Sequence, residues 1–172
     1  TFATSATAPS WVAPAGGGKV AQIVNVTVRT VISGTTNMPD DDTVPQNDEG
    51  IECMTLAITP TSATNRLSID SIVNASSTSA GQWIMALFQD TTATALATAH
   101  IMTSLTAGGH VDNGILIHDM VAGTTSETTF KIRAGWGTST FYFNAETYGS
   151  RTGGTQGDSL CSTIRIIEYD PS

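Results

Sequence analysis

The feature that most constrains the fold of this chain is a stretch of strict alternation that begins at Val20. A period of two residues is typical of a strand with one buried face, because successive side chains point to opposite sides. One face collects Val20, Gln22, Val24, Val26, Val28 and Ile32, and the other collects Ala21, Asn25, Thr27 and Arg29. The pattern therefore predicts a half-buried strand that ends at Ser33-Gly34 and leads into an acidic turn.

Eight further segments carry strand patterns between turn residues: 51–58, 66–73, 83–88, 95–105, 115–121, 130–134, 140–145 and 160–169. Thr is the commonest residue, 29 of 172, and its branched Cβ packs well on a pleated surface. The nearly continuous apolar run Trp83–Phe88 is expected to be covered on both faces. A helix competes only in the Ala-rich segment Ala95–Leu105, where several Thr residues and the lack of a helical apolar stripe favour a strand. About nine short strands at this spacing predict an all-β, jelly-roll-like β-sandwich with almost no helix.

Residues 1–19 differ in composition from the rest of the chain. They are small and polar, with Pro9, Pro14 and a Gly16-Gly17-Gly18 run, and such a segment buries too little surface to fold alone. We therefore expect an extended arm or linker at 1–19 and a β-sandwich domain at 20–172. Phe2 and Trp11 are the large apolar groups of the arm. They either pack on their own domain or anchor the arm on a neighbouring subunit or particle.

The charge of the chain excludes some partners. Seven basic and fifteen acidic side chains give a formal net charge of −8, whereas nucleic-acid binding needs clustered Lys and Arg. No apolar run reaches the roughly 20 residues of a membrane-spanning helix, and the first residues lack the basic-then-apolar layout of a secretion signal. We expect neither nucleic-acid binding nor membrane insertion.

The metal-binding residue types are present without a metal-binding spacing. Cys53 and Cys161 are the two thiols, and without a secretion signal or a second pair we favour two buried free cysteines over a disulfide. Neither lies in a CxxC pair or beside a His, which argues against metal or redox chemistry. His100 and His118 lie on neighbouring expected strands, but structural zinc sites usually draw two ligands from one tight local spacing. We expect hydrogen-bonded or interface histidines and no cofactor.

An acidic run precedes the second expected strand: Asp40, Asp41, Asp42, Asp48, Glu49 and Glu52. Carboxylate oxygens are ligands of Ca²⁺, but the run lacks the D-x-[DN]-x-[DN]-G pattern of a calcium loop. Pro39 and Pro45 bracket it as they would an ordinary turn. A solvated acidic loop is the favoured interpretation.

Catalytic signatures are lacking. The chain has no G-x-S-x-G elbow and no Ser or Cys in a local catalytic motif. A carboxylate pair for glycoside cleavage depends on a separation that sequence does not contain. We expect a protein that is not an enzyme.

Five of the eleven aromatic residues lie between 136 and 148. Phe141 and Phe143 share one face of an expected strand and are predicted to be core. Trp136 lies between two glycines, and Tyr148 and Arg151 lie in a Gly-rich segment. Loops on a rigid scaffold often carry recognition, and Trp, Tyr and Arg are enriched in contact surfaces. These three are the candidate ligand-binding residues, with Trp136 alternatively closing the end of the sandwich.

Several phrases of the sequence are similar to a known domain: GKV at 18–20, PDDDTVPQNDEG at 39–50, MTLAITPTSATNRL at 54–67, ALFQDTTATALA at 86–97 and MVAGTTSETTFKIRAG at 120–135. Together they resemble a β-rich domain of tailed bacteriophages and prophages, found at or near the C-terminus of fibre, spike or other virion surface proteins. The opening TAPSWVAPAGGGK at 7–19 is similar to the junction that precedes this domain in longer fibres. The resemblance spans residues 7–168 and contains no catalytic signature.

The resemblance implies a virion protein with a trimeric, jelly-roll-like head that binds a host-surface glycan or protein. The chain contains no long fibre shaft, and the loops at 108–113 and 148–158 carry none of the familiar phrases. An alternative is a structural capsid decoration or head-fibre protein, held to the shell by its N-terminal arm. A virion-associated carbohydrate hydrolase is a third class.

Overall fold

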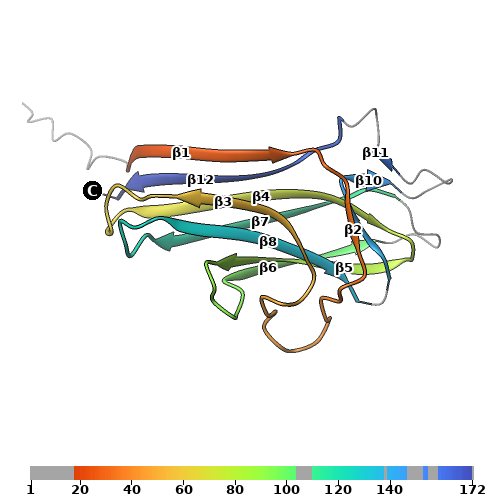
Figure 1. Ribbon diagram of the computed structural model, residues 1–172. Coiled ribbons are helices and arrows are strands. Elements are labelled where there is room, and N and C mark those ends of the chain that lie inside the picture. Colours follow the sequence, from red (N-terminus) through yellow and green to blue (C-terminus); the bar gives the residue numbers. More distant parts are fainter. Residues whose placement is uncertain (1–17, 104–109, 138, 147–152, 155–158, 172) are drawn as a thin grey trace, which may run out of the picture.

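The described part of the computed structural model comprises residues 18–103, 110–137, 139–146, 153–154 and 159–171. These residues form strands and no helix (Figure 1). The strands are β1 (Lys19–Val28), β2 (Ile32–Gly34), β3 (Ile51–Ile58), β4 (Arg66–Ser77), β5 (Gly81–Gln89), β6 (Ala97–Thr103), β7 (Asp112–Val121), β8 (Thr128–Trp136), β9 (Phe141–Phe143), β10 (Ala145–Glu146), β11 (Gly153–Gly154) and β12 (Ser162–Asp170). The predicted all-β class is confirmed.

Two antiparallel sheets pack face to face as a β-sandwich. In one sheet the long strands follow the order β1-β12-β4-β7. β9 pairs with the last residues of β4, beyond the point where β12 begins, and β2 pairs with β9. The other sheet has the order β3-β8-β5-β6. The core lies between the sheets and contains, among others, Trp83, Met85, Leu87, Ile69, Phe130, Ile132, Phe141, Phe143, Ile164 and Ile166. The sandwich follows from the alternation, because each sheet buries one face against the other, and the strand orders of the two sheets make it jelly-roll-like.

The single strand expected from Val20 to Gly34 is interrupted at residues 29–31, which separate β1 from β2. The alternation was also misleading at the start of β1. Val20 pairs with Tyr169, whereas Gln22 pairs with Glu168, so Ala21 is an extra residue that forms a bulge. A bulge inserts one residue into one strand and reverses which side chains share a face. Val24, Val26 and Val28 pack against the core as predicted, but Val20 lies on the outer face and is 52% exposed.

The two ends of the sandwich differ. Lys19 at the start of β1 pairs with Asp170 at the end of β12, so both described chain ends lie at one end (Figure 1). We call this the tethered end. At the opposite end, the distal end, β6 finishes and β7 begins, β4 is joined to β5, β8 finishes, and β12 begins. The connections between those strands therefore start and finish at the distal end.

A buried carboxylate holds the tethered end together. Glu168 on β12 has no exposed surface and accepts hydrogen bonds from the amides of Gln22 and Asn65, at 2.6 and 2.7 Å. The backbone N–H and hydroxyl of Thr61 also donate to it, both at 2.8 Å. One side chain thus joins β1, β12 and the turn between β3 and β4. Burial raises the pKa of this carboxyl, but the hydrogen bonds from Gln22, Asn65 and Thr61 outweigh it and hold the pKa of Glu168 below its ordinary value.

Replacing Glu168 by glutamine should therefore lower the free energy of unfolding at neutral pH by about 1–3 kcal/mol, because an amide nitrogen would then face donors. A carboxylate with a lowered folded-state pKa stabilises the fold above its unfolded-state pKa, about 4.3 for Glu, and loses that contribution as pH falls through the folded-state value. Urea unfolding of wild type and Glu168→Gln should therefore converge on acidification. The exposed Glu127, changed to Gln, is the control and should match wild type throughout. Equal stability of Glu168→Gln and wild type at neutral pH would contradict this role of Glu168 at the tethered end.

Candidate functional site

The acidic segment between β2 and β3, residues 35–50, covers the outer face of the β3-β8-β5-β6 sheet. Met38 is 1% exposed and packs with Ile84, Ala86 and Phe88, the outward side chains of β5. This explains the continuous apolar run of β5, whose inner side chains lie in the main core and whose outer ones lie beneath this segment. The prediction that β5 is covered on both faces is confirmed. The plug formed by Met38 was not predicted.

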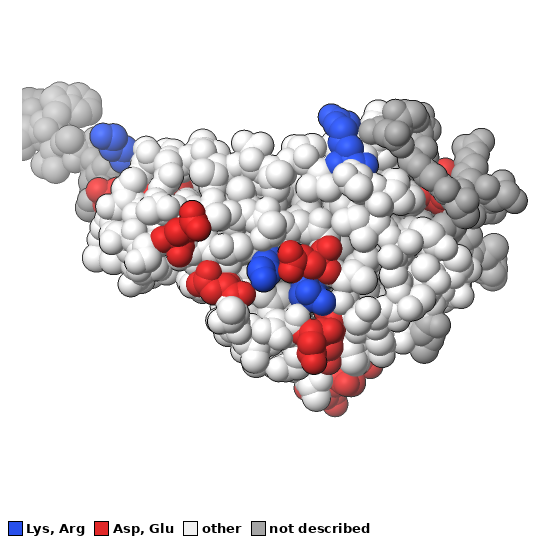
Figure 2. All heavy atoms as spheres, viewed as in Figure 1, with Lys and Arg blue, Asp and Glu red and all other residues white. Residues whose placement is uncertain are grey.

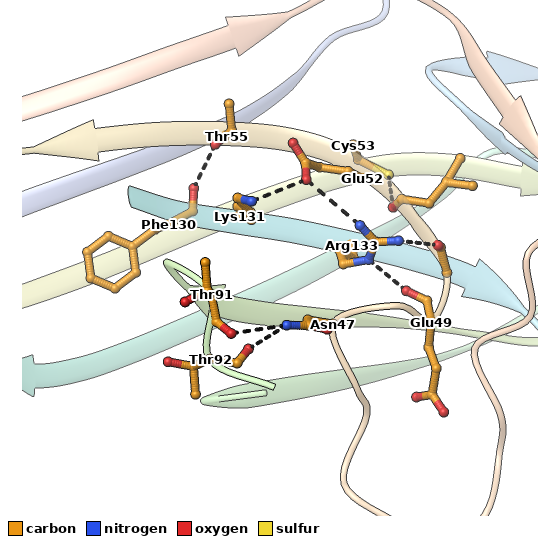
Figure 3. A network of polar contacts seen from close by, with 12 residues as sticks. Asn47, Glu49, Glu52, Cys53, Thr55, Thr91, Thr92, Phe130, Lys131 and Arg133 are labelled. Carbon is orange, nitrogen blue, oxygen red and sulfur yellow. Dashed lines mark hydrogen bonds and ion pairs between the residues drawn. The ribbon is translucent and has the colours of Figure 1, made fainter. Parts of the chain in front are cut away.

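Arg133 on β8 fastens the end of this segment (Figure 3). Its guanidinium donates to the carbonyl oxygens of Glu49 and Gly50, each at 2.7 Å, and lies 3.8 Å from the carboxylate of Glu52. Lys131 also lies 3.8 Å from Glu52. In Figure 2, basic and acidic side chains lie side by side near the middle of this side, and further charged side chains lie toward its rim. These contacts hold the segment in place, and the charged groups of Arg133, Lys131 and Glu52 contact one another or the backbone of the segment.

The acids of the segment have local partners. Asp41 accepts hydrogen bonds from the backbone N–H and the hydroxyl of Thr43, at 2.8 and 2.5 Å, and these bonds lower the pKa of its carboxyl. Asp40 lies 3.4 Å from Nε2 of His100. Within the described ranges, no group of three or more His, Cys, Asp or Glu side chains could hold a metal ion. The calcium and zinc alternatives thus gain no ligand cluster in the described part of the chain.

The two histidines considered together in the sequence belong to different environments. His100 lies on β6 and points outward, half-exposed, toward Asp40. His118 lies on β7, in the other sheet, opposite the fully buried Ile69. Antiparallel partners share a face, so His118 points inward.

The candidate ligand-binding residues are only partly described. Trp136 ends β8, opposite Trp83 on β5, and is 4% exposed. Its ring packs near Gly81, so it closes the distal end of the core, the alternative weighed from the sequence. Tyr148 and Arg151 lie outside the described residues, and so do the anchor candidates Phe2 and Trp11. Phe141 and Phe143 are buried as predicted.

Both cysteines are free. Cys53 is buried, and burial raises the pKa of its thiol to about 12, with smaller opposing effects from a backbone hydrogen bond and Arg133. A thiol in that state is a poor nucleophile and metal ligand. The prediction of free cysteines is confirmed. The prediction that both are buried is wrong for Cys161, which is only half-buried.

The outer face of the β1-β12-β4-β7 sheet was not singled out from the sequence. Large apolar side chains stand exposed on it, with Ile115 and Ile117 on β7 at 61% and 65%, and Ile72 on β4 at 41%. Ile115 lies directly opposite Ile72. Exposed apolar side chains that adjoin one another mark contact surfaces more often than isolated ones. The triplet Ile115-Leu116-Ile117 was the sequence signal, because consecutive apolar residues in a strand place apolar groups on both faces.

Comparisons with known proteins identify the fold but no family. No family model and no curated protein matches the chain. Among solved structures, the chain is similar to Eiger TNF from S. frugiperda, with a TM-score of 0.51, 6% identity, and coverage of 87% of this chain and 94% of that one. A second similarity is to dimeric latent PorU from Porphyromonas gingivalis, with a TM-score of 0.39, 10% identity, and coverage of 91% of this chain and 14% of that one. No described segment forms a helix of the length and apolarity that crossing a membrane requires.

The cover over β5 should depend on Gly50. Its φ is +60°, and an added Cβ would lie 2.7 Å from both the carbonyl oxygen of Ala134 and Cε of Met38. We expect Gly50→Ala to destabilise the fold by about 1–3 kcal/mol and to increase binding of a hydrophobic dye as Ile84 and Phe88 become exposed. Gly137→Ala is the matched control, because a Cβ there meets nothing closer than 4.0 Å. Equal melting temperatures for the two variants would contradict this role of Gly50.

Proposed function

We propose that this chain is a bacteriophage virion surface protein whose β-sandwich forms a trimeric fibre or spike head and attaches to a host-surface glycan. The phrases at 39–50, 54–67, 86–97 and 120–135 support the phage assignment, because they resemble the β-rich domain of virion surface proteins. The fold is compatible with it, since a sandwich is a rigid carrier for variable loops. In this proposal the protein is located in the virion.

The observation that carries the proposal is the polarity of the sandwich. The described chain begins and ends at the tethered end, where Lys19 pairs with Asp170. The strands that flank residues 104–111 and 155–161 finish or begin at the distal end. A head attached through residues 1–19 would therefore direct the connections of the distal end away from the particle.

Recognition in this proposal belongs to the segment that contains Tyr148 and Arg151. An aromatic ring stacks on the apolar face of a sugar, and a guanidinium donates hydrogen bonds to hydroxyl or carboxylate oxygens. The indole of Trp136 is buried, so in this proposal it packs in the core beneath the distal end and does not contact the glycan.

The second candidate is a structural capsid decoration or head-fibre protein. The same polarity favours it, because an arm that enters at the tethered end and carries Phe2 and Trp11 would hold the sandwich on a shell. The two candidates differ in whether the distal end binds anything.

The full chain is expected to bind host-type glycans on an array, and Tyr148→Ala or Arg151→Ala should weaken binding by about 10-fold or more, roughly 1.4 kcal/mol. Glu127→Gln, in the turn between β7 and β8 at the tethered end, is the control and should bind as wild type. Particles that lack the protein should adsorb poorly to the host. Normal adsorption with reduced capsid stability would reject the receptor role in favour of the structural one, and release of sugar from host polysaccharide would indicate a hydrolase.

A further inference from the structure

We propose that copies of this chain associate through the outer face of the β1-β12-β4-β7 sheet. We call this surface the open face; it consists of Val20, Ile23, Asn25, Thr27, Arg66, Ser68, Asp70, Ile72, Ile115, Ile117, Asp119, Val121, Thr163, Arg165, Ile167 and Tyr169. The inference rests on the proposed trimer for the number of copies. It does not depend on the host or the particle.

The apolar groups of the open face form two strips. Strip one lies on β7 and the adjoining part of β4, and contains Ile72, Ile115, Ile117 and Val121. Strip two lies on β1 and β12, and contains Val20, Ile23 and Ile167. The bulge at Ala21 places Val20 in strip two, since without it this side chain would point into the sandwich. Covering an exposed isoleucine side chain with a partner contributes about 25 cal/mol of favourable free energy for each Å² of apolar surface removed from water.

On the other sheet, the apolar outer face is covered by a segment of the chain itself. There, residues 35–50 close over β5, and Met38 seals Ile84, Ala86 and Phe88. The side chains of strip one have no such cover from the described residues, and Ile117 stays 65% exposed. A cover supplied by another molecule accounts for this difference.

Charge favours another copy as that molecule. The chain carries a net charge of −8, so identical molecules repel one another over most orientations. The open face carries two arginines, Arg66 and Arg165, and two aspartates, Asp70 and Asp119, so its own formal charge is zero. Two open faces therefore bring no net like charge together at the contact, and the remaining repulsion between the chains acts over longer distances, where salt screens it.

Each of these four charged groups has a polar partner within the face. Arg165 lies 2.5 Å from Asp70. Arg66 donates to the hydroxyl of Tyr169 at 3.2 Å, and that hydroxyl donates to Asp119 at 3.5 Å. Burying a charge is costly mainly when it is left unpaired. Association over these groups would not strand an isolated charge.

The size of the face also suits an interface. Four strands spaced about 4.8 Å apart, with about eight residues rising 3.3 Å each, span roughly 500 Å² in projection. Side-chain relief increases the accessible area toward the about 800 Å² that one partner buries in a standard interface. In a trimer this area would be divided between the two neighbours of each copy.

The separation of the two strips suits a ring. β1 and β7 are three strand spacings apart, about 14 Å, and a polar hollow of about 390 Å³ lies between the strips, lined by Asn25, Asp70, Ile72, Thr163 and Arg165. In a head-to-tail ring, strip one of each copy would pack on strip two of the next copy. Such a heterologous contact forms a closed ring when a whole number of rotations between neighbours makes one full turn. A ring of three copies would be the proposed trimer.

The test is the mass in solution of the full chain, measured by light scattering during gel filtration over a range of concentrations. Wild type should have three times the mass of one chain. Ile117→Lys in strip one and Ile23→Lys in strip two should each weaken association by about 30-fold or more. Both side chains are exposed in one copy, so each variant should keep the β-sheet circular dichroism of wild type. Met102→Lys is the matched control, because Met102 is 72% exposed on β6, in the other sheet.

The outcomes separate the claims. A wild-type trimer that persists in both strip variants would overturn the open face as the interface and leave the trimer standing. Dissociation by Phe2→Ala with Trp11→Ala, while both strip variants stay trimeric, would assign association to the arm and also overturn the inference. A monomeric wild type would remove both the trimer and the interface. Loss of the trimer in the strip variants, combined with normal host adsorption by particles that lack the protein, would support the open face and reject the receptor role.

Discussion

The packing of one sheet on the other is the constraint from which the rest of this structure follows. The indole of Trp83 shows how tight it is, because a Cβ on Gly114 of the opposite sheet would come within 2.6 Å of its ring and within 2.7 Å of the sulfur of Met85. The same indole lies 5.5 Å from the ring of Phe141, centroid to centroid. A core this closely packed tolerates little change in volume. It leaves the two outer faces as the surfaces on which chains of this fold can differ.

The two outer faces differ in whether the chain itself covers their apolar side chains. One is closed by residues 35–50, held through Met38 below and through Arg133 at the end, so its apolar groups belong to the folded monomer. The other keeps its isoleucines at the surface, beside the ion pair of Arg165 with Asp70 and the hydroxyl of Tyr169, which contacts both Arg66 and Asp119. The acidic segment, for which the sequence favours a solvated loop over a calcium loop, is in addition a cover, with Met38 buried beneath it and its acids on the outer side.

Sequence reasoning succeeded where the period of two was uninterrupted and failed where one residue changed the face. The inward side chains Leu67, Ile69 and Val73 of β4 follow directly from alternation. The bounds of β3 agree with the segment expected between Gly50 and Pro60, although a bulge between Glu52 and Met54 interrupts its alternation. The bulge at Ala21 moved Val20 to the other side, and no local residue type announces it. Trp136 seemed to belong to a loop because glycines flank it, but Gly135 is small for another reason. A Cβ there would lie 3.0–3.1 Å from Thr36, Met38 and Gly50 of the cover. Met38 itself is a contact between residues distant in sequence, which no local pattern contains.

Association through a sheet face and display from one end are compatible because they use perpendicular directions. Strands of β1, β12, β4 and β7 run between the tethered and distal ends, so a contact on the open face leaves both ends uncovered. Copies arranged in this way would present their tethered ends together and their distal ends together. A weak contact at each distal end would then be multiplied, since linked sites bind with a high effective concentration. A single short segment with one tyrosine and one arginine would be a modest binding site alone, and the proposed association of the open faces would add the multivalency that it lacks.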